Sequence, residues 1–391
     1  MINQVKKDFS SSSSVQLSHH RIIVIGGSLG GLCAALALRC INCDVKVFEK
    51  SPGDMKSRGA GLVVQREIID FLKEHNIATE EAVSIPAYKR QYLRRDGTIE
   101  LEEQTLQLMT SWDMLYRQLR DIFPNNLYHN STKMTNFEQK KDHVVVHYEG
   151  NKNDEICELL IGADGSNSTL RRQLLPEVLP SYAGYVAWRG VVNENEVPTV
   201  VSDFFSDKFT FFIGNKTHIL CYLIPGPNGE LSRGKRRLNW VWYVNTPKGN
   251  ILKEVLTDKD GKLREFSVAE RMVNEDIVKK QKIVAGNILP HMFHNLVSTT
   301  KEPFIQTIYD LSVHKMAFHR ACLIGDAAFV VRPHTAASTS KAAANAIELA
   351  KSIQQQKGDI VTALTKWEPS QLALGNYLTS LGIGLGNSSQ I

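Results

Sequence analysis

A glycine-rich turn near the start of the chain most strongly limits the folds open to it. Residues 21–39 read RIIVIGGSLGGLCAALALR, which is a short apolar run, a turn and a helix-like segment. The continuous apolar run at 21–25 is typical of a strand buried on both faces of a parallel sheet. Residues 29–39 have apolar side chains on every side, as a deeply packed helix does, and 44–48 reads as the next strand. The pattern predicts a strand–helix–strand unit of a nucleotide-binding fold.

The turn departs from the usual dinucleotide-binding pattern at its centre. Such a turn uses one glycine for the sharp bend, a second for close approach to the pyrophosphate and a third for helix packing. Gly26 and Gly31 occupy the first and third places, but Ser28 stands at the second. Glu49 ends the following strand, where a carboxylate can accept hydrogen bonds from an adenosine ribose. The alternative is a tight strand–helix turn that holds no ligand.

Composition narrows the class of protein. The chain has 391 residues, which predicts one large or two interleaved domains. Its net charge of +5 is too diffuse to indicate nucleic-acid binding, and no apolar stretch is long enough for a membrane span. Cys40 and Cys43 form a lone C-x-x-C without the second pair that a zinc site needs. We therefore expect reduced thiols, no metal and a cytoplasmic location.

The middle of the chain changes character. Aromatic and β-branched segments, separated by turn-rich stretches, predict a mostly antiparallel sheet inserted into the nucleotide-binding fold. These segments are 209–213, 218–224 and 238–244. An alanine-rich helix is expected over 342–353, with its first signals near Ser338, and the last ten residues are expected to fray.

Two later segments indicate which nucleotide is bound. Residues 159–175, LLIGADGSNSTLRRQLL, run from an apolar strand into a Gly-Ala-Asp-Gly turn. Residues 320–346, RACLIGDAAFVVRPHTAASTSKAAANA, contain another strand that ends at Gly325 and Asp326. With the first turn, these motifs give the chain a strong resemblance to the FAD-dependent aromatic hydroxylases, which are p-hydroxybenzoate hydroxylase-like, single-component flavoprotein monooxygenases.

The resemblance covers essentially the whole chain after an N-terminal leader expected over residues 1–19. The stretches TSWDMLYRQL at 110–119, YAGYVAWRGVV at 182–192 and RPHTAAS at 332–338 resemble the pyridine hydroxylase subgroup of that family. The resemblance implies an α/β fold in which a Rossmann-like FAD-binding domain carries an inserted, mostly antiparallel β-sheet substrate domain. The expected division is a disordered leader over 1–19, an FAD-binding domain over 20–75, 105–180 and 301–391, and a substrate-binding domain over 76–104 and 181–300.

The resemblance also implies roles for individual residues. The turn at 26–31 would bind the FAD pyrophosphate, Glu49 the adenosine ribose and Asp326 the ribityl chain, while Asp164 would serve both FAD and the pyridine nucleotide. A buried carboxylate is costly unless it is hydrogen-bonded, and sugar hydroxyls are suitable donors, although both aspartates also fit a structural turn cap. The helix from Ser338 would point its positive N-terminus at the flavin pyrimidine edge. The implied cofactor-binding residues are Gly26, Gly27, Ser28, Leu29, Gly30, Gly31, Glu49, Lys50, Arg58, Asp164, Asp326, Pro333, Ala336, Ala337 and Ser338.

The turn before that helix departs from the family pattern. The family commonly has histidine at Phe329 and proline at Arg332, and it has two glycines and an asparagine at Ala336, Ser338 and Ser340. The pyridine hydroxylase subgroup departs here as well. The departures therefore bear on how tightly the flavin is held and how freely it moves.

The resemblance implies the reaction of the family. NADH or NADPH reduces FAD, dioxygen adds to the reduced flavin, and the C4a-hydroperoxide gives one oxygen to an aromatic or N-heteroaromatic small molecule. A phenolic or hydroxy-N-heterocyclic substrate needs a base within hydrogen-bond reach. His218, Tyr222 and His334 are candidates by residue type, and each also fits a structural role. The active form is expected to be a monomer or a homodimer.

Several alternatives stay open. A monooxygenase of the same fold could act on a larger polycyclic natural product by hydroxylation, epoxidation or antibiotic inactivation. The altered turn at 336–340 keeps open a flavin-binding protein without turnover. A halogenase is less favoured, because the WVW at 240–242 is not followed by Ile-Pro and its alternation fits a half-buried strand. Trp188 and Arg189 fit either a pocket wall or a pair at a sheet edge.

Overall fold

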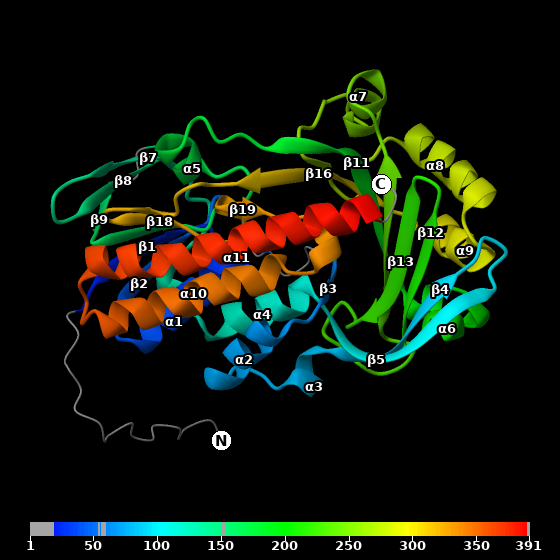
Figure 1. Cartoon of the computed structure of the whole chain (residues 1–391), viewed down its shortest axis with the longest axis horizontal. Helices are drawn as coiled ribbons and strands as arrows, with labels where there is room; N and C mark the ends of the chain where they lie inside the picture. The colour runs from blue at the N-terminus through cyan, green and yellow to red at the C-terminus, as the bar shows by residue number, and fades with distance from the viewer. Residues whose placement is uncertain (1–18, 54, 56–59, 151–152, 389–391) are drawn as a thin grey trace.

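The computed structural model describes residues 19–53, 55, 60–150 and 153–388. Apart from residue 19, the leader expected at the N-terminus lies outside these residues. Two large sheets dominate the described chain, and they lie side by side along the long axis of the molecule (Figure 1).

The first sheet contains the nucleotide-binding unit. Its strands are β1 (Arg21–Ile25), β2 (Asp44–Phe48), β6 (Tyr128–His129), β10 (Leu159–Gly162), β17 (Ala317–Phe318) and β18 (Ala321–Leu323). They run in the order β17-β18-β10-β1-β2-β6, and all neighbours are parallel except β17 and β18. The strands predicted at 21–25 and 44–48 are confirmed residue for residue. The Rossmann-like part of the predicted fold is therefore present.

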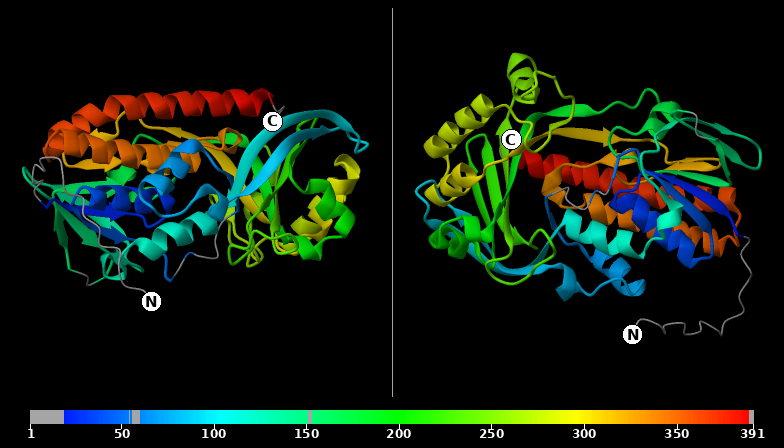
Figure 2. Two further views of the ribbon diagram at one scale, coloured as in Figure 1. Left: turned by 90° about the horizontal axis from the view of Figure 1, so that it is seen from below. Right: turned by 180° about the vertical axis from the view of Figure 1, so that it is seen from behind.

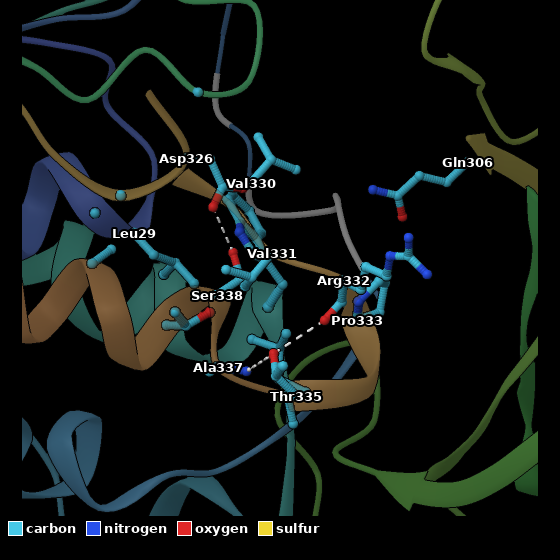
Figure 3. Close-up of a pocket in the computed structure, with 18 of the residues that line it drawn as sticks. Leu29, Gln306, Asp326, Val330, Val331, Arg332, Pro333, Thr335, Ala337 and Ser338 are labelled. Carbon is cyan, nitrogen blue, oxygen red and sulfur yellow. Dashed lines mark hydrogen bonds between the residues drawn. The ribbon is translucent and has the colours of Figure 1, made fainter. Parts of the chain in front are cut away.

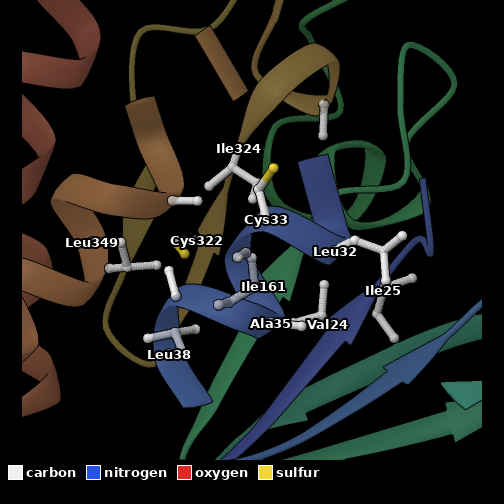
Figure 4. Packing of buried hydrophobic residues seen from close by; sticks show 14 of the residues in the cluster. Val24, Ile25, Leu32, Cys33, Ala35, Leu38, Ile161, Cys322, Ile324 and Leu349 are labelled. Atoms are coloured by element: carbon white, nitrogen blue, oxygen red, sulfur yellow. The ribbon is translucent and has the colours of Figure 1, made fainter. Parts of the chain in front are cut away.

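Helices cover one face of this parallel sheet. They are α1 (Leu29–Cys40), α2 (Arg66–Glu74), α4 (Trp112–Ile122), α10 (Ser338–Gln355) and α11 (Ile360–Ser388). Figure 4 shows α1 on the sheet, with Leu32 and Cys33 between the helix and the strands and Leu349 of α10 beyond it. Val24 and Ile161 in the strands are fully buried. Each such aliphatic side chain contributes about 1.5–3 kcal/mol through burial, so this contact anchors the turn between β1 and α1.

A small sheet completes this half of the molecule. It consists of β7 (Met134–Gln139), β8 (Val144–Tyr148) and β9 (Glu155–Cys157), and its inward side chains join the same core cluster. The short elements of this half are α3 (Glu80–Val83), α5 (Thr169–Leu174), η1 (Asn125–Leu127), η3 (Gly325–Ala327) and η4 (Pro333–Thr335).

The second large sheet is ten-stranded and mostly antiparallel. Its strands are β3 (Gly61–Val63), β4 (Ile85–Leu93), β5 (Ile99–Ser111), β11 (Ser181–Asn193), β12 (Lys208–Gly214), β13 (Thr217–Ile224), β14 (Arg237–Asn245), β15 (Ser267–Val268), β16 (Phe304–Ser312) and β19 (Phe329–Val330). The order is β15-β16-β11-β14-β13-β12-β4-β5-β3, with β19 on β16, and β12 with β4 is the parallel pair. The inserted antiparallel sheet is confirmed.

Helices also cover the outer face of this second sheet. They are α6 (Thr199–Phe205), α8 (Glu275–Ile288) and α9 (His291–Thr299), with α7 (Asn250–Leu256) and η2 (Glu194–Glu196) nearby. Trp240 and Trp242 are buried under them at 1% and 0% exposure, while Val241 on the opposite face is also buried. The strand predicted at 240–242 is confirmed, but its half-buried character was wrong, because Val241 on the opposite, cavity-lining face is buried as well.

The C-terminal helix corrects a second prediction. Residues 382–388 do not fray, because α11 continues to Ser388. Gly382 and Gly386 pack closely against Arg332, so tertiary contact holds the end of the helix. Figure 2 shows α11 running the length of the parallel-sheet half and ending beside the antiparallel sheet. Among the described residues, no helix combines the length and apolar character that a membrane crossing requires.

Candidate functional site

A cavity of ≈ 950 Å³ lies between the two large sheets. Its lining residues come from the ends of β1, β2 and β10, from the region between β18 and α10, and from one face of the antiparallel sheet. The volume is at the upper end of the ~300–1,000 Å³ that ligand pockets usually have. One cavity thus receives residues from all three sequence motifs.

The turn after β1 forms one wall. Gly26 has a φ of +105°, and a Cβ there would lie 2.3 Å from the Ala163 carbonyl oxygen. At Gly31, a Cβ would lie 1.8 Å from the Gly26 oxygen. Ser28 lines the cavity with an ordinary φ of −75°. Glycine is therefore required at the first and third places of the turn but not at the middle one.

The first turn of α1 offers hydrogen-bond donors to the cavity. The first bond within the helix runs from the Leu32 N–H to the Ser28 carbonyl, at 2.9 Å. The N–H groups of residues 29–31 consequently have no acceptor inside the helix, and such helix N-termini bind anions. Leu29 and Gly30 line the cavity, whereas neither Gly27 nor Gly31 is among its described lining residues.

Glu49 stands beside this turn at the end of β2. Its carboxylate accepts hydrogen bonds from the backbone N–H groups of Gly27 and Ser51, each at 2.8 Å. These two bonds orient the side chain and leave lone pairs for a ligand hydroxyl. Glu49 and the following Lys50 both line the cavity.

Asp164 lies on the cavity wall next to the start of α5. Its Oδ2 accepts from the backbone N–H groups of Thr169 at 2.6 Å and Leu170 at 3.3 Å. This is the structural cap that the sequence left open as an alternative. Its Oδ1 is buried without a hydrogen-bond partner among the described residues, and burial raises the pKa of this carboxyl. One oxygen therefore serves the fold, and the other is an acceptor that the described residues leave unused.

Asp326 faces the cavity from η3, next to the N-terminus of α10 (Figure 3). Its Oδ1 accepts hydrogen bonds from the Ser338 hydroxyl at 2.9 Å and the Lys341 ammonium at 3.0 Å. Pro333 and the residues 336–338 line the cavity beside it. Arg58 lies outside the described residues, and every other predicted cofactor residue except Gly27 and Gly31 lines the cavity.

At the other end of the cavity, the antiparallel sheet and η4 contribute aromatic and imidazole side chains. His218 and His334 stack with ring centroids 5.6 Å apart, and Tyr243 lies 4.4 Å from His334. The Tyr185 hydroxyl lies 3.1 Å from Nε2 of His334. All of these residues except Tyr185 line the cavity, and so does Tyr222. The three predicted candidates for a base therefore share one wall.

Burial determines the charge of these side chains. Desolvation, with the charge of the neighbouring His334, lowers the pKa of His218 to about 3. Desolvation and the nearby Arg332 lower the pKa of His334 to about 4. Burial also raises the pKa of Tyr222. Both imidazoles and the phenol are neutral at pH 7, and both ring nitrogens of His218 lack a partner among the described residues.

Two arginines of the antiparallel sheet, Arg90 and Arg189, line this wall. Arg189 lines the cavity from β11, inside the sheet between β14 and β16, and Trp188 lies on the opposite, helix-covered face. The sequence left two alternatives for Trp188 and Arg189. Arg189 belongs to a pocket wall, and the alternative of a pair at a sheet edge was wrong. The Arg189 Nη1 donates to Gln306 at 3.1 Å, and its buried Nε has no partner among the described residues.

Acidic residues are confined to the opposite end. The carboxylates among the described lining residues are Glu49, Asp164 and Asp326, all next to the parallel sheet. No described lining residue from the antiparallel sheet is acidic. The cavity thus has one end suited to hydroxyls and phosphates, and an aromatic end with two arginines and no described carboxylate.

Comparisons with known proteins agree with this geometry. Residues 182–310 match the model of the FAD binding domain-like family. The chain is 35% identical over 367 residues to the 2,6-dihydroxypyridine 3-monooxygenase of Paenarthrobacter nicotinovorans, and the alignment covers 92% of the chain and 89% of the relative. The chain belongs to the FAD-dependent aromatic hydroxylases.

Solved structures support the same assignment. The 2,6-dihydroxypyridine-3-hydroxylase from Arthrobacter nicotinovorans superposes with a TM-score of 0.91 at 33% identity, covering 96% of this chain and 94% of that one. This is the subgroup that the three sequence stretches indicated, and the prediction is confirmed. Klebsiella pneumoniae HpxO, complexed with FAD and uric acid, shares the fold with a TM-score of 0.79 at 20% identity, over 97% of this chain and 91% of that one.

The enzyme is an FAD-dependent monooxygenase, and its parallel-sheet end fits the cofactor. Two helix N-termini, those of α1 and α10, suit anionic groups. The carboxylates of Glu49, Asp164 and Asp326 suit hydroxyl groups, and the unpartnered Asp164 oxygen is an acceptor without another use. Bound FAD supplies the redox chemistry, for which NADH or NADPH is the usual co-substrate in this family.

Sequence reasoning missed several wall residues. Tyr243 comes from the strand predicted at 238–244, but the register that turns it inward was not predictable. Gln306 lies in β16, which was not predicted as a strand. Lys341 lies within the motif at 320–346, but no role was predicted for it. A lysine in the first turn of a helix, where a cation is disfavoured, was the signal that could have identified it.

Proposed function

We propose that this enzyme hydroxylates a hydroxylated N-heteroaromatic ring, with 2,6-dihydroxypyridine as the first compound to test. One observation carries the proposal: the FAD-suited end and an aromatic, acid-free end belong to one cavity. FAD takes up much of the ≈ 950 Å³, so the remainder suits a small ring better than a polycyclic natural product. The identity to a 2,6-dihydroxypyridine 3-monooxygenase supports the same substrate class.

The substrate is proposed to bind as an anion. Arg189 and Arg90 offer cations at this end of the cavity, and no described carboxylate from the same sheet lines the cavity beside them. A charge-assisted bond to Arg189 favours the deprotonated hydroxyl of the ring, which is the electron-rich form. The neutral His218, with two unpartnered nitrogens, is proposed to exchange a hydrogen bond with a second ring substituent.

The cofactor contacts are proposals of the same kind. Ser28 and the N–H groups that follow it would receive the pyrophosphate, Glu49 the adenosine ribose and Asp326 the ribityl chain. All three line the cavity and have acceptors or donors that the protein leaves available.

The proposed location is the cytoplasm. All six cysteines are unpaired, and five of them are buried. Unpaired thiols match a reducing compartment, where NADH and NADPH are also available.

Substrate-stimulated oxidation of NADH or NADPH tests the function. Purified enzyme loaded with FAD should oxidise the nicotinamide faster with 2,6-dihydroxypyridine than alone, and labelled dioxygen should place one oxygen in the product. A panel of hydroxypyridines, phenols and polycyclic phenols would rank the substrate classes. Stimulation by the polycyclic compounds alone would contradict the proposal, and no stimulation by any compound would favour a flavin-binding protein without turnover.

A further inference from the structure

A buried lysine stands behind the FAD-suited end of the cavity. Lys341, in the first turn of α10, is 2% exposed and is not among the described lining residues. A cation is disfavoured there because the helix N-terminus already carries a partial positive charge. Burial of an ammonium group is also costly unless close partners compensate it. Because Lys341 does not itself line the cavity, any effect that it has on a ligand there must act through the residues it contacts.

Its partners connect Lys341 to the cavity wall. The ammonium lies 3.0 Å from Oδ1 of Asp326 and also donates to the carbonyl of Phe329. The Ser338 hydroxyl donates to the same Oδ1 at 2.9 Å. Two donors thus hold one carboxylate oxygen from behind, and the Asp326 side chain keeps 39% of its surface exposed, on the cavity side. Figure 3 shows Asp326 and Ser338 joined on this wall.

These contacts lie in the turn where the sequence departs from the family. Phe329 replaces the common histidine, and Ser338 replaces a glycine. Lys341 and Ser338 both contact Asp326, and Lys341 also contacts Phe329. The altered turn therefore contains a hydrogen-bonded unit that fixes one carboxylate.

We propose that Lys341 is a positioning residue for FAD, which holds the Asp326 carboxylate oriented so that its free oxygen accepts a hydroxyl of the cofactor. The inference rests on the proposed role of Asp326. When FAD covers Asp326, the carboxylate loses its water, and a desolvated carboxylate needs a compensating charge. Lys341 is the described cation that contacts this carboxylate.

Titration of the apoprotein with FAD, followed by flavin fluorescence, measures the FAD affinity without any turnover. Lys341→Met should lose about 10- to 100-fold in FAD affinity at neutral pH, the usual range for a lost hydrogen bond to a charged group. Lys341→Arg should restore most of the FAD affinity, since the cation beside Asp326 is retained. Lys351→Met is the matched control, because Lys351 lies on the same helix in an exposed pair with Glu348. It should bind FAD as the wild-type protein does.

A double-mutant cycle separates positioning from plain structural support. If Lys341 acts through Asp326, Lys341→Met should cost less than about threefold in FAD affinity when Asp326→Asn is already present. Circular dichroism checks that each variant is folded. If Lys341→Met does not fold, Ser338→Ala removes the second donor to the same oxygen and should lower FAD affinity by about 3- to 10-fold.

Several outcomes would overturn the inference. Wild-type affinity in folded Lys341→Met would do so, and so would additive losses in the cycle. These results would leave the proposed function intact, because they concern FAD binding alone. A wild-type protein that binds FAD normally but hydroxylates no hydroxypyridine would contradict the proposed function without affecting the role of Lys341.

Discussion

Single residues explain why the nucleotide-binding turn tolerates an imperfect motif. The backbone at Ser28 adopts a φ of −75°, which any residue can take, so a serine meets the requirement of the middle place. Gly31 is different, because the obstacle there is the Gly26 carbonyl oxygen, 1.8 Å from the position of a Cβ. Sequence alone suggested that serine is acceptable, but only the backbone conformation explains the reason.

This difference predicts opposite outcomes for two small substitutions. Ser28→Gly should bind FAD within about threefold of the wild-type affinity, since it removes only a side chain that makes no capping bond. Gly31→Ala should lower the free energy of unfolding by about 1–3 kcal/mol, because α1 must move away from β1, and FAD affinity should fall with it. Urea unfolding and flavin titration measure both. Equal behaviour of the two variants would contradict this account of the turn.

His218 provides a pH prediction at the same scale. Its pKa is lowered to about 3 in the folded protein, chiefly by desolvation, whereas an unfolded histidine titrates near ~6.5. Between these values the unfolded state binds the extra proton, so stability is lost as pH falls. From pH 7 to pH 5, this one residue should cost about 2 kcal/mol of unfolding free energy.

The measurement compares urea unfolding of wild-type apoprotein and His218→Asn at both pH values. The variant should show a smaller acid loss, by about the same 2 kcal/mol. His143→Asn is the control, since its imidazole lies in an exposed strand connection beside Asp142. An unchanged acid loss in His218→Asn would show that His218 is protonated in the folded state.

At the scale of elements, the accuracy of sequence reasoning followed the strength of the local pattern. The strands 21–25 and 44–48 were predicted to the residue, because apolar runs between turns define them. The end of α11 was not, because glycine and serine in 382–388 favour fraying unless tertiary contacts intervene. Those contacts come from Arg332, far away in the sequence, so no local signal could reveal them.

Glycines in α11 should respond according to the face they occupy. A Cβ on Gly375 would lie 2.4 Å from the buried Phe329 ring, whereas a Cβ on Gly384 would meet nothing within 4 Å. Gly375→Ala should therefore destabilise the protein by about 1–3 kcal/mol through overpacking. Gly384→Ala should stabilise it by up to about 1 kcal/mol, the usual gain for alanine in a helix. Thermal unfolding distinguishes the two, and a stabilised Gly375→Ala would contradict the close packing of α11.

At the scale of the whole molecule, most of the predicted cofactor residues line one cavity, but most residues of its substrate end were not predicted. The three motifs meet around one cavity, as parallel strand ends require, so twelve of the predicted cofactor positions line it. The substrate wall was harder to predict, because strand register decides which side chains of β11 and β14 face inward. The sequence allowed a pocket-wall position for Arg189, but it could not show that this residue faces the cavity. The boundaries between FAD-binding and substrate-binding domains stay a prediction.

The separation of charges across the cavity predicts that its two ends can be disabled independently. Glu49→Gln replaces an oxygen that accepts from Gly27 or Ser51 with an NH₂ donor, so FAD affinity should fall by about 10- to 100-fold. Arg189→Met removes one of the two lining arginine cations at the other end. It should leave FAD affinity within about twofold and lower kcat/KM for 2,6-dihydroxypyridine by about 10- to 100-fold.

Arg233→Met is the matched control for Arg189→Met, because Arg233 is an exposed arginine between β13 and β14, paired with Asp203. It should change neither quantity. The loss in Arg189→Met should also shrink as the substrate hydroxyl is protonated at lower pH, since a neutral ring has less to gain from a guanidinium. If Arg189→Met instead released FAD while turnover of reconstituted enzyme stayed normal, the cation would belong to the cofactor, and the division of the cavity into a nucleotide end and a substrate end would be wrong.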